Sequence, residues 1–382
     1  MPFHRCKTIN TPIHRVTTIT SSSMEDFRIK NNYGREGTPT TNLLANRLCD
    51  LYKSDGCVLT PSGMTSITLA FMSILKSKDH ILIPDCILGS ARRFIEQELP
   101  RLKITYDFYN VRDLKQLETL INNNTKAIYI ESPGTYTFEI INIKKVTEIC
   151  RKHNLKSLAD NTWATALHFN PFDFGVDIVI EAISKYASGH SDVMMGVALA
   201  NKDNLSELQR WHKNCGICVS SDDAYLVLRG LDTLFMRLEK SSKNSIEIAK
   251  YLEKKQEVKK IIHPALRQHP DYKLWKKDFK GSCGVFAIEF KDNIDELAIN
   301  ELVNNCKIFN IGTSWGGNHS LLATTDVSKC RNLSSSYVPS GQYLRIYAGT
   351  EDIKDLLDDL DFAFKRMRQY ILSRVGDALL FW

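Results

Sequence analysis

Short apolar runs alternate with amphipathic segments through the middle of the chain. The runs show little internal polar alternation, which is typical of strands buried on both faces of a sheet. We expect such strands at residues 80–85, 103–109, 127–132, 157–160 and 177–183. Between several of them lie segments with helical periodicity, and residues 143–153 are long enough for a crossover helix. The alternation predicts an α/β fold with a mostly parallel sheet, whose ligands bind beyond the carboxyl ends of the strands.

The regions on either side of this alternation have different sequence patterns. Residues 1–40 lack clear periodicity and are expected to form an extended arm, whereas a helical leucine pattern begins at Thr41. A chain of 382 residues exceeds the usual limit of a single core. We therefore expect a large domain over 41–232 and a smaller C-terminal α+β domain over 233–382. Within the latter we expect a long helix at 238–255, strands at 285–290 and 343–348, and a terminal helix from Asp352.

Composition and charge exclude several classes of protein. The chain is 43% hydrophobic and 25% charged, as in ordinary globular proteins. Its net charge of +6 comes from scattered residues, and short basic clusters such as Lys254–Lys255 have acidic neighbours, so we expect no nucleic-acid partner. No apolar run approaches the ~18 residues that span a bilayer, and no apolar block follows the basic start. We expect no membrane partner and a cytoplasmic location.

The ten cysteines show no disulfide-like regularity, which fits a reducing compartment. Cys215 and Cys218 have CxxC spacing. A zinc site would need a second pair, and a thioredoxin-like site would need a different βαβ context. We therefore expect two reduced structural thiols here and no metal site.

Three features at strand and helix ends suggest shared chemistry. Asp160 closes one predicted strand, Lys185 follows another, and Ser62, Gly63 and Met64 open a helix whose free amides favour a phosphate. Each is weak alone, since a strand-end lysine is usually solvated and an aspartate there is usually a turn residue. Together they match pyridoxal phosphate (PLP), which needs a lysine for its aldehyde, a carboxylate for its ring nitrogen and an anchor for its phosphate.

The chain also resembles a known family. The motifs are YGREGT at 33–38, SGM at 62–64, ESPG at 131–134, DNTWA at 160–164, SKYASGHSDVMMG at 184–196, SWGG at 314–317 and LRIYAGTED at 344–352. In this order, and over nearly the whole chain, they resemble the Cys/Met-metabolism group of PLP-dependent enzymes, and within it most closely the bacterial cystathionine β-lyases. The resemblance implies the aspartate-aminotransferase-like fold of type I, PLP as cofactor, and a homotetramer built from two active dimers.

The resemblance also implies roles for the residues that hold the cofactor. Lys185 would form the Schiff base and remove the substrate Cα proton. Asp160 would pair with the pyridinium nitrogen. The amides of Gly63 and Met64 would bind the phosphate, and Ser184 would add a hydroxyl where the family usually has threonine.

Further roles concern the neighbouring subunit and the substrate. By resemblance, Tyr33 and Arg35 would reach across to the phosphate of a neighbouring subunit. Arg345 would hold the substrate carboxylate with help from Ser314 and Trp315. A planar guanidinium matches a carboxylate with two parallel hydrogen bonds, which supports the role of Arg345 independently.

Besides Ser184, two positions depart from the family pattern. Leu88 stands where the family has a tyrosine that stacks on the cofactor ring, so both aromatic stacking and a phenolic hydroxyl are missing there. Tyr129 and Tyr136 are the nearest tyrosines in the next strand-loop unit, and the sequence does not show whether either reaches the ring. Thr313 stands where the most similar β-lyases carry a larger aromatic residue. His190, after the lysine, is interpreted as structural.

The implied reaction is α,β-elimination of L-cystathionine to homocysteine, pyruvate and ammonia. Cysteine desulfhydration, γ-elimination and alanine racemisation share its early steps and stay open as alternatives. Racemisation needs a second acid or base on the opposite face, so Leu88 argues against it without excluding it. A non-catalytic descendant that keeps the fold is a further alternative, against which the presence of Lys185, Asp160 and Arg345 argues.

Overall fold

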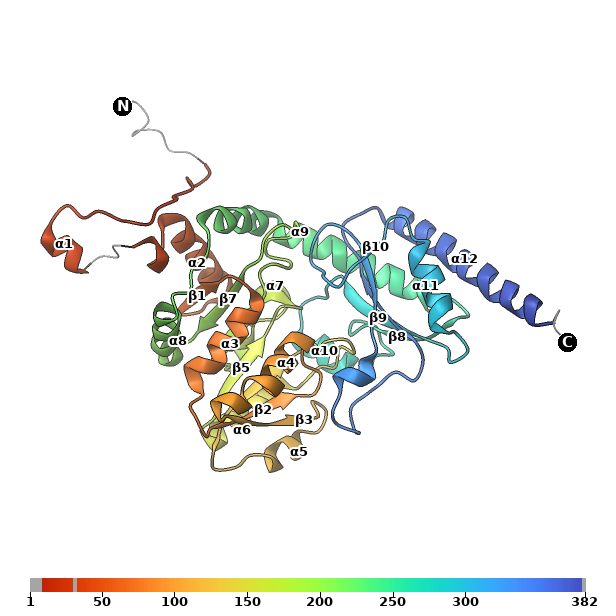
Figure 1. The fold of residues 1–382 in the computed structure, drawn as a ribbon, viewed down its shortest axis with the longest axis horizontal. Coiled ribbons are helices and arrows are strands. Elements are labelled where there is room, and N and C mark those ends of the chain that lie inside the picture. Colours follow the sequence, from red (N-terminus) through yellow and green to blue (C-terminus); the bar gives the residue numbers. More distant parts are fainter. Residues whose placement is uncertain (1–8, 30–32, 380–382) are drawn as a thin grey trace.

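The computed structural model describes residues 9–29 and 33–379, and they are built around two β-sheets. The first sheet has seven strands in the order β1-β7-β6-β5-β4-β2-β3, and the second has five in the order β10-β11-β12-β9-β8. Helix α9 (Ser221–Leu252) runs from the first sheet to the second (Figure 1). The chain therefore crosses once from a large α/β unit to a smaller C-terminal unit.

The seven-stranded sheet contains all five strands that the apolar runs predicted. Its strands are β1 (Gly56–Thr60), β2 (His80–Pro84), β3 (Thr105–Tyr109), β4 (Thr125–Glu131), β5 (Lys156–Asp160), β6 (Ile178–Glu181) and β7 (Gly196–Ala200). The run β3-β2-β4-β5-β6 is parallel, while β7 is antiparallel to both β6 and β1. The mostly parallel sheet is confirmed, and β1 and β7 are strands that we did not predict.

Helices cover both faces of this sheet. They are α2 (Pro39–Tyr52), α3 (Gly63–Ile74), α4 (Gly89–Gln97), α5 (Leu114–Thr119), α6 (Ile143–His153), α7 (Thr165–His168) and α8 (Lys202–Asn214). Successive strand residues bury their side chains in two separate clusters, as strand geometry requires. In β6, Val179 joins the cluster that holds Leu44 of α2, whereas Ile178 and Ile180 join the one that holds Phe71 of α3. The sheet is thus enclosed, which explains its continuous apolar strands.

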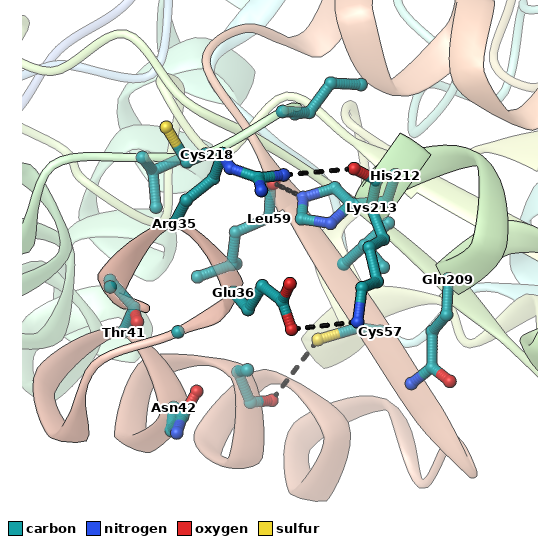
Figure 2. A pocket seen from close by; sticks show the side chains of 16 residues that line it. Arg35, Glu36, Thr41, Asn42, Cys57, Leu59, Gln209, His212, Lys213 and Cys218 are labelled. Atoms are coloured by element: carbon teal, nitrogen blue, oxygen red, sulfur yellow. Dashed lines mark hydrogen bonds and ion pairs between the residues drawn. The ribbon is translucent and has the colours of Figure 1, made fainter. Parts of the chain in front are cut away.

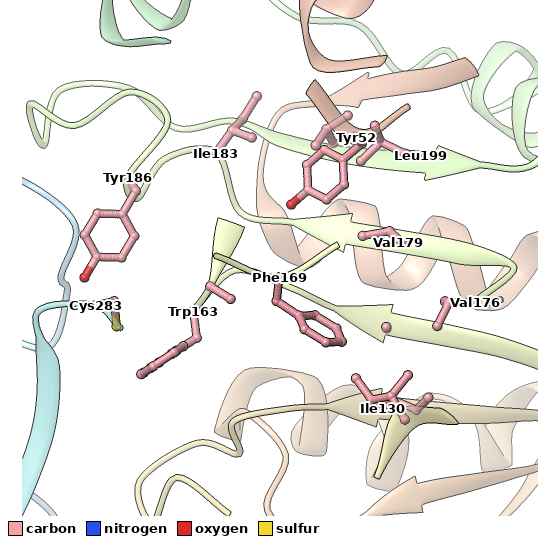
Figure 3. Close-up of a cluster of buried hydrophobic side chains, with 14 of the residues drawn as sticks. Tyr52, Ile130, Trp163, Phe169, Val176, Val179, Ile183, Tyr186, Leu199 and Cys283 are labelled. Carbon is pink, nitrogen blue, oxygen red and sulfur yellow. The ribbon is translucent and has the colours of Figure 1, made fainter. Parts of the chain in front are cut away.

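One of these clusters continues toward the second sheet. Figure 3 shows Tyr52, Phe169 and Leu199 among its side chains, all of them buried. At the edge of the same view, Tyr186 points toward the segment that carries Cys283. Its hydroxyl accepts a hydrogen bond of 2.8 Å from the amide of Gly284. The core therefore links the loop after β6 directly to the smaller unit.

The smaller unit is a mostly antiparallel sheet covered by helices. Its strands are β8 (Val258–Ile262), β9 (Val285–Phe290), β10 (Asn310–Ile311), β11 (Leu321–Thr324) and β12 (Tyr343–Tyr347), and its helices are α10 (Tyr272–Asp278), α11 (Glu296–Asn304) and α12 (Ile353–Leu379). β9, β12 and α12 lie where the sequence predicted them. β8, β10 and β11 were not predicted.

The long connecting helix begins earlier than expected. We placed it at 238–255, but α9 starts at Ser221, where the Ser220 hydroxyl accepts a hydrogen bond from the Asp222 amide (3.1 Å). Val227 packs in the core of the large unit and Ile248 in that of the small unit, so the helix belongs to both. The domain boundary proposed after residue 232 falls inside this helix, and the division into 41–232 and 233–382 stays a proposal.

The described part of the N-terminal arm extends away from the body of the molecule (Figure 1). It contains the short helix α1 (Met24–Ile29) and the 3-10 turn η2 (Gly34–Glu36). Where it meets the body, Arg15 forms an ion pair with Asp222 of α9. Over the residues that the structure describes, no helix combines the length and the apolar character needed to cross a membrane.

Candidate active site

A cavity of about 330 Å³ lies where the large sheet faces the smaller unit. The carboxyl ends of β4 and β5 and the turn after β6 form one wall, and the first turns of α3 and α4 form another. The smaller unit contributes Thr313, Trp315 and Arg345. Parallel strands end at a common edge of a sheet, which is why Asp160 and Lys185 share this cavity.

Lys185 presents a partly desolvated amine to the cavity. Its Nζ donates a hydrogen bond of 2.8 Å to Ser314 Oγ and lies 5.6 Å from the centroid of the Trp315 ring. Burial and, to a smaller extent, the positive charge of Arg345 lower the pKa of Lys185 to about 8. At pH 7 about a tenth of the amine is thus unprotonated, far more than for an ordinary lysine, and a nucleophile or base requires this form.

The loop that carries Ser314 packs closely on the backbone of Lys185. Gly316 has a φ of +89°, a conformation that favours glycine, and a Cβ there would lie 2.7 Å from the carbonyl carbon of Lys185. The close approach of the two segments therefore depends on glycine. This contact positions Ser314 for its hydrogen bond with the lysine.

Glu131 and Glu181 are buried and Asp160 is half-buried, and Asp160 and Glu131 line the same cavity as the lysine. Burial raises the pKa of Asp160, against hydrogen bonds from Thr162 and Tyr129 that lower it. Burial and the nearby charge of Asp160 raise the pKa of Glu131 to about 8, and burial is the main reason that the pKa of Glu181 rises to about 7. A cationic group beside Asp160 would favour the ionised form of these carboxyls.

The start of α3 forms a concave backbone surface. Ser62 caps the helix by accepting a hydrogen bond of 3.1 Å from the Thr65 amide, so the first-turn amides of Gly63 and Met64 have no acceptor within the helix. A Cβ on Gly63 would lie 2.5 Å from the Cβ of Ala182, so only glycine fits against the turn that leads to Lys185. This surface matches the expected phosphate site.

Ser184 is engaged elsewhere. Its Oγ donates to the carbonyl of Met195 (2.9 Å) and accepts from the Met195 amide (2.7 Å). The hydroxyl lines the cavity but is held within the turn between β6 and β7. A contact with phosphate would require it to redirect its proton, and this role stays a prediction.

Arg345 brings a positive charge to the opposite side of the cavity. It lies in β12, where it pairs in register with Ala287 and Ala323, and its Nη2 donates a long hydrogen bond of 3.5 Å to the Gly312 carbonyl. Small neighbours leave the guanidinium room to reach the cavity, where no carboxylate among the described residues forms an ion pair with it. This is a suitable receptor for an anionic ligand group.

Leu88 and Tyr136 both line the cavity, whereas Tyr129 does not. Leu88 is the residue before α4, and its amide donates a hydrogen bond of 2.9 Å to Glu131 Oε2. Tyr129 is fully buried, and its hydroxyl lies 3.5 Å from Asp160 Oδ2. Glu131 received no role from the sequence, although the ESPG motif contains it. Trp163, within DNTWA, is another lining residue to which we assigned no function.

Arg35 lines a different cavity, of about 310 Å³, which shares no lining residue with the first, and its guanidinium carbon lies 5.8 Å from the centroid of the Tyr33 ring. Figure 2 shows Arg35 extended across its mouth, where Nη1 donates to the Lys213 carbonyl (3.2 Å). Beside it, Glu36 forms an ion pair of 3.0 Å with Lys213. Within one chain these residues do not join Lys185, and their action on a neighbouring subunit stays a prediction.

Two other sequence features lie outside the Lys185 cavity. Cys215 and Cys218 are both free and exposed, and Cys218 lines the cavity of Arg35. No cluster of histidine, cysteine and carboxylate side chains suited to a metal ion occurs within residues 9–29 and 33–379. His190 Nδ1 is 2.7 Å from the carbonyl oxygen of Ser188, in agreement with a structural role.

Comparison with known proteins adds independent information. Residues 3–365 match the family model described as Cys/Met metabolism PLP-dependent enzyme. A relative from Wolbachia pipientis wMel, named L-alanine/L-glutamate racemase, is 39% identical over 88% of this chain and 83% of its own length. The cystathionine beta-lyase of Haemophilus influenzae is 30% identical over 94% of both chains. The structure of cystathionine gamma synthase from Xanthomonas oryzae pv. oryzae in complex with cystathionine superposes with a TM-score of 0.89 at 28% identity, over 94% of each chain.

Proposed function

The chain belongs to the Cys/Met-metabolism family of PLP-dependent enzymes, and from this premise we propose that it cleaves L-cystathionine by α,β-elimination to homocysteine, pyruvate and ammonia. The observation that carries the proposal is the amine of Lys185, whose pKa of about 8 suits proton transfer and which shares its cavity with Arg345. The name of the Haemophilus relative supports the choice of substrate.

The residues around the cavity fit PLP. The half-buried Asp160 would face the ring nitrogen, whose positive charge would favour the carboxylate that desolvation now disfavours. The amides of Gly63 and Met64 would receive the phosphate, and Lys185 would bind the aldehyde carbon. When bound, PLP supplies an electron sink for the charge that develops at the substrate Cα.

The protein's own residues would then have separate roles in binding the substrate and moving its proton. Arg345 binds the α-carboxylate with two parallel hydrogen bonds and so orients the Cα–H bond. Lys185 removes the Cα proton, and Ser314 holds its amine in place before the substrate arrives. Trp315 covers this side of the cavity and limits the access of water to the reacting atoms.

Racemisation of a small amino acid is the second candidate, and a specific observation favours it. The Wolbachia relative, which carries a racemase name, is more similar to this chain than the Haemophilus β-lyase is. Racemisation requires proton exchange at Cα on both faces. Leu88 cannot provide the second group, but Tyr136 reaches the same cavity and can ionise or donate a proton.

One set of reactions tests both candidates. Purified protein with added PLP is incubated with L-cystathionine, L-alanine or L-glutamate in deuterated water, while pyruvate, free thiol, D-amino acid and the loss of the Cα–H signal are followed. Equal release of pyruvate and thiol supports the lyase. Exchange with formation of D-amino acid and no thiol supports the racemase.

The matched variants are Lys185→Ala and Lys126→Ala, because Lys126 is an exposed lysine of β4. Only the first should lose both turnover and exchange. If the wild-type protein binds PLP but neither reacts nor exchanges with any of the three amino acids, both candidates are wrong.

A further inference from the structure

The position of Leu88 leaves part of the cavity wall without a polar group. Leu88 ends the loop before α4, is 38% exposed and has an aliphatic side chain. Next to it, Gly89 has no side chain, and the nearest atom to a Cβ built there is the hydroxyl oxygen of Tyr136, at 3.6 Å. The phenol of Tyr136 therefore reaches, from another loop, the backbone next to Leu88 in the wall of the same cavity.

The backbone of Tyr136 is held in an uncommon conformation. Its φ is +73°, which L-residues with large side chains rarely adopt. The Tyr343 hydroxyl donates a hydrogen bond of 2.6 Å to the Tyr136 carbonyl. On either side, Arg331 Nη2 donates to the Thr135 carbonyl (3.0 Å) and to Thr137 Oγ1 (2.5 Å). Strain of this kind persists only where several contacts impose it, and it is concentrated at functional sites.

The side chain of Tyr136 is fixed as well. Its ring packs edge-on against the ring of Tyr343, with the centroids 6.4 Å apart and the planes at 87°. Tyr343 and Arg345 belong to the same strand, so the support of the phenol and the carboxylate receptor form one rigid element. The phenol is thereby held in a fixed position relative to the strand that carries Arg345.

The electrostatic environment keeps the phenol protonated. Burial and the nearby Cys330 thiol raise the pKa of Tyr136, while the positive charge of Arg345 lowers it. The group is therefore a neutral hydrogen-bond donor near neutral pH. Arg345 stabilises the phenolate that a proton transfer would leave behind.

We propose that Tyr136 is a second proton-transfer residue, which donates its phenolic proton to the substrate after Lys185 has taken the Cα proton. This inference rests on the proposed function. In the elimination, the Cβ–S bond of the substrate breaks and its electron pair stays on the homocysteine sulfur. The phenolic O–H bond breaks as an S–H bond forms on that sulfur, and the phenolate regains a proton from water or from the Lys185 ammonium. The step involves no net oxidation or reduction, and the proton lost from Cα is balanced by the one gained at sulfur.

The test compares Tyr136→Phe with the control Tyr106→Phe, since Tyr106 lies on the sheet-edge strand β3 and does not line the cavity. Tyr136→Phe keeps the ring that packs on Tyr343 and removes only the hydroxyl. We expect thiol release to fall about 100-fold in kcat/KM, as for loss of a general acid. PLP affinity, measured by spectrophotometric titration, and the thermal midpoint should stay as in the wild type.

Rescue and spectroscopy separate a chemical role from a structural one. Adding Leu88→Tyr to Tyr136→Phe returns a phenol to the same wall and should recover at least about tenfold of the lost rate. In protein labelled with 3-fluorotyrosine, the ¹⁹F resonance that is missing in Tyr136→Phe should shift on addition of PLP and again on addition of L-cystathionine. The resonance missing in Tyr106→Phe should stay in place.

The possible results of these measurements lead to different conclusions about Tyr136 and about the reaction. An unshifted Tyr136 resonance in protein that binds PLP overturns the inference, as does a Tyr136→Phe variant with the wild-type rate or one whose loss follows PLP affinity. A shift accompanied by Cα exchange but no thiol keeps Tyr136 as the donor and rejects the lyase. Protein that binds no PLP rejects the proposed function and this inference together.

Discussion

Replacing Lys185 with methionine should stabilise the cofactor-free protein near neutral pH. The pKa of Lys185 falls from 10.5 to about 8, mainly through burial. This difference of about 2.5 pKa units, at 1.36 kcal/mol per unit, corresponds to about 3 kcal/mol that the folded protein loses by keeping the amine charged. Methionine has a similar length and no charge. Loss of the hydrogen bond to Ser314 offsets about 1 kcal/mol, which leaves a gain of about 2 kcal/mol in the free energy of unfolding.

The sign of the pH dependence follows from proton binding. The folded wild-type protein releases the Lys185 proton near pH 8, whereas the unfolded chain holds it until about pH 10.5. Between these values the unfolded state binds more protons, so the stability of the wild type rises with pH. The advantage of Lys185→Met is therefore full below about pH 8 and disappears as the pH approaches 10.5.

Urea unfolding followed by tryptophan fluorescence measures this difference at about pH 7 and about pH 10. Lys126→Met is the control, because Lys126 is exposed on β4 and carries no burial penalty. The reasoning is refuted if Lys185→Met is less stable than the wild type at the lower pH. It is also refuted if its advantage is the same at both pH values, since the cost would then not come from the charge of the amine.

Three further results are expected. Asp85→Ala should lower the free energy of unfolding by about 3–5 kcal/mol. The reason is that it leaves the buried guanidinium of Arg92, now 2.9 Å from that carboxylate, without this partner. In the same urea titration, the double variant Asp85→Leu with Arg92→Met should lower the free energy of unfolding by less than Asp85→Ala does. Arg345→Lys should raise KM for L-cystathionine about 10- to 100-fold while PLP affinity stays constant, because lysine cannot form two parallel hydrogen bonds to a carboxylate. Arg35→Ala and Lys185→Ala should each be inactive alone but regain turnover when mixed and allowed to exchange subunits, whereas a mixture that stays inactive would show that Arg35 does not act across an interface.

The elements that the sequence predicted best are those with strong local signals. The five parallel strands are short apolar runs, and α6 has a clear period that ends at Asn154, a residue in the left-handed conformation with φ of 52°. The strands β1 and β7 are rich in small residues and pair with each other although they lie about 140 positions apart, from Gly56↔Ala200 to Thr60↔Gly196. Such pairing depends on tertiary contacts, and no local sequence pattern predicts it.

The sequence by itself determined the positions of Asp160 and Lys185, because polar residues that follow parallel strands must gather at one edge of the sheet. It also located glycine at the start of α3, where a backbone surface is needed. Only the tertiary structure brought Arg345 to that edge and placed Tyr136, not Tyr129, beside Leu88. The physical reason is that the sheet fixes the position of each strand end, whereas the direction of a loop side chain depends on partners that are distant in the sequence. For Tyr136 those partners are Tyr343, and Arg331 through Thr135 and Thr137, all about two hundred residues away in the chain.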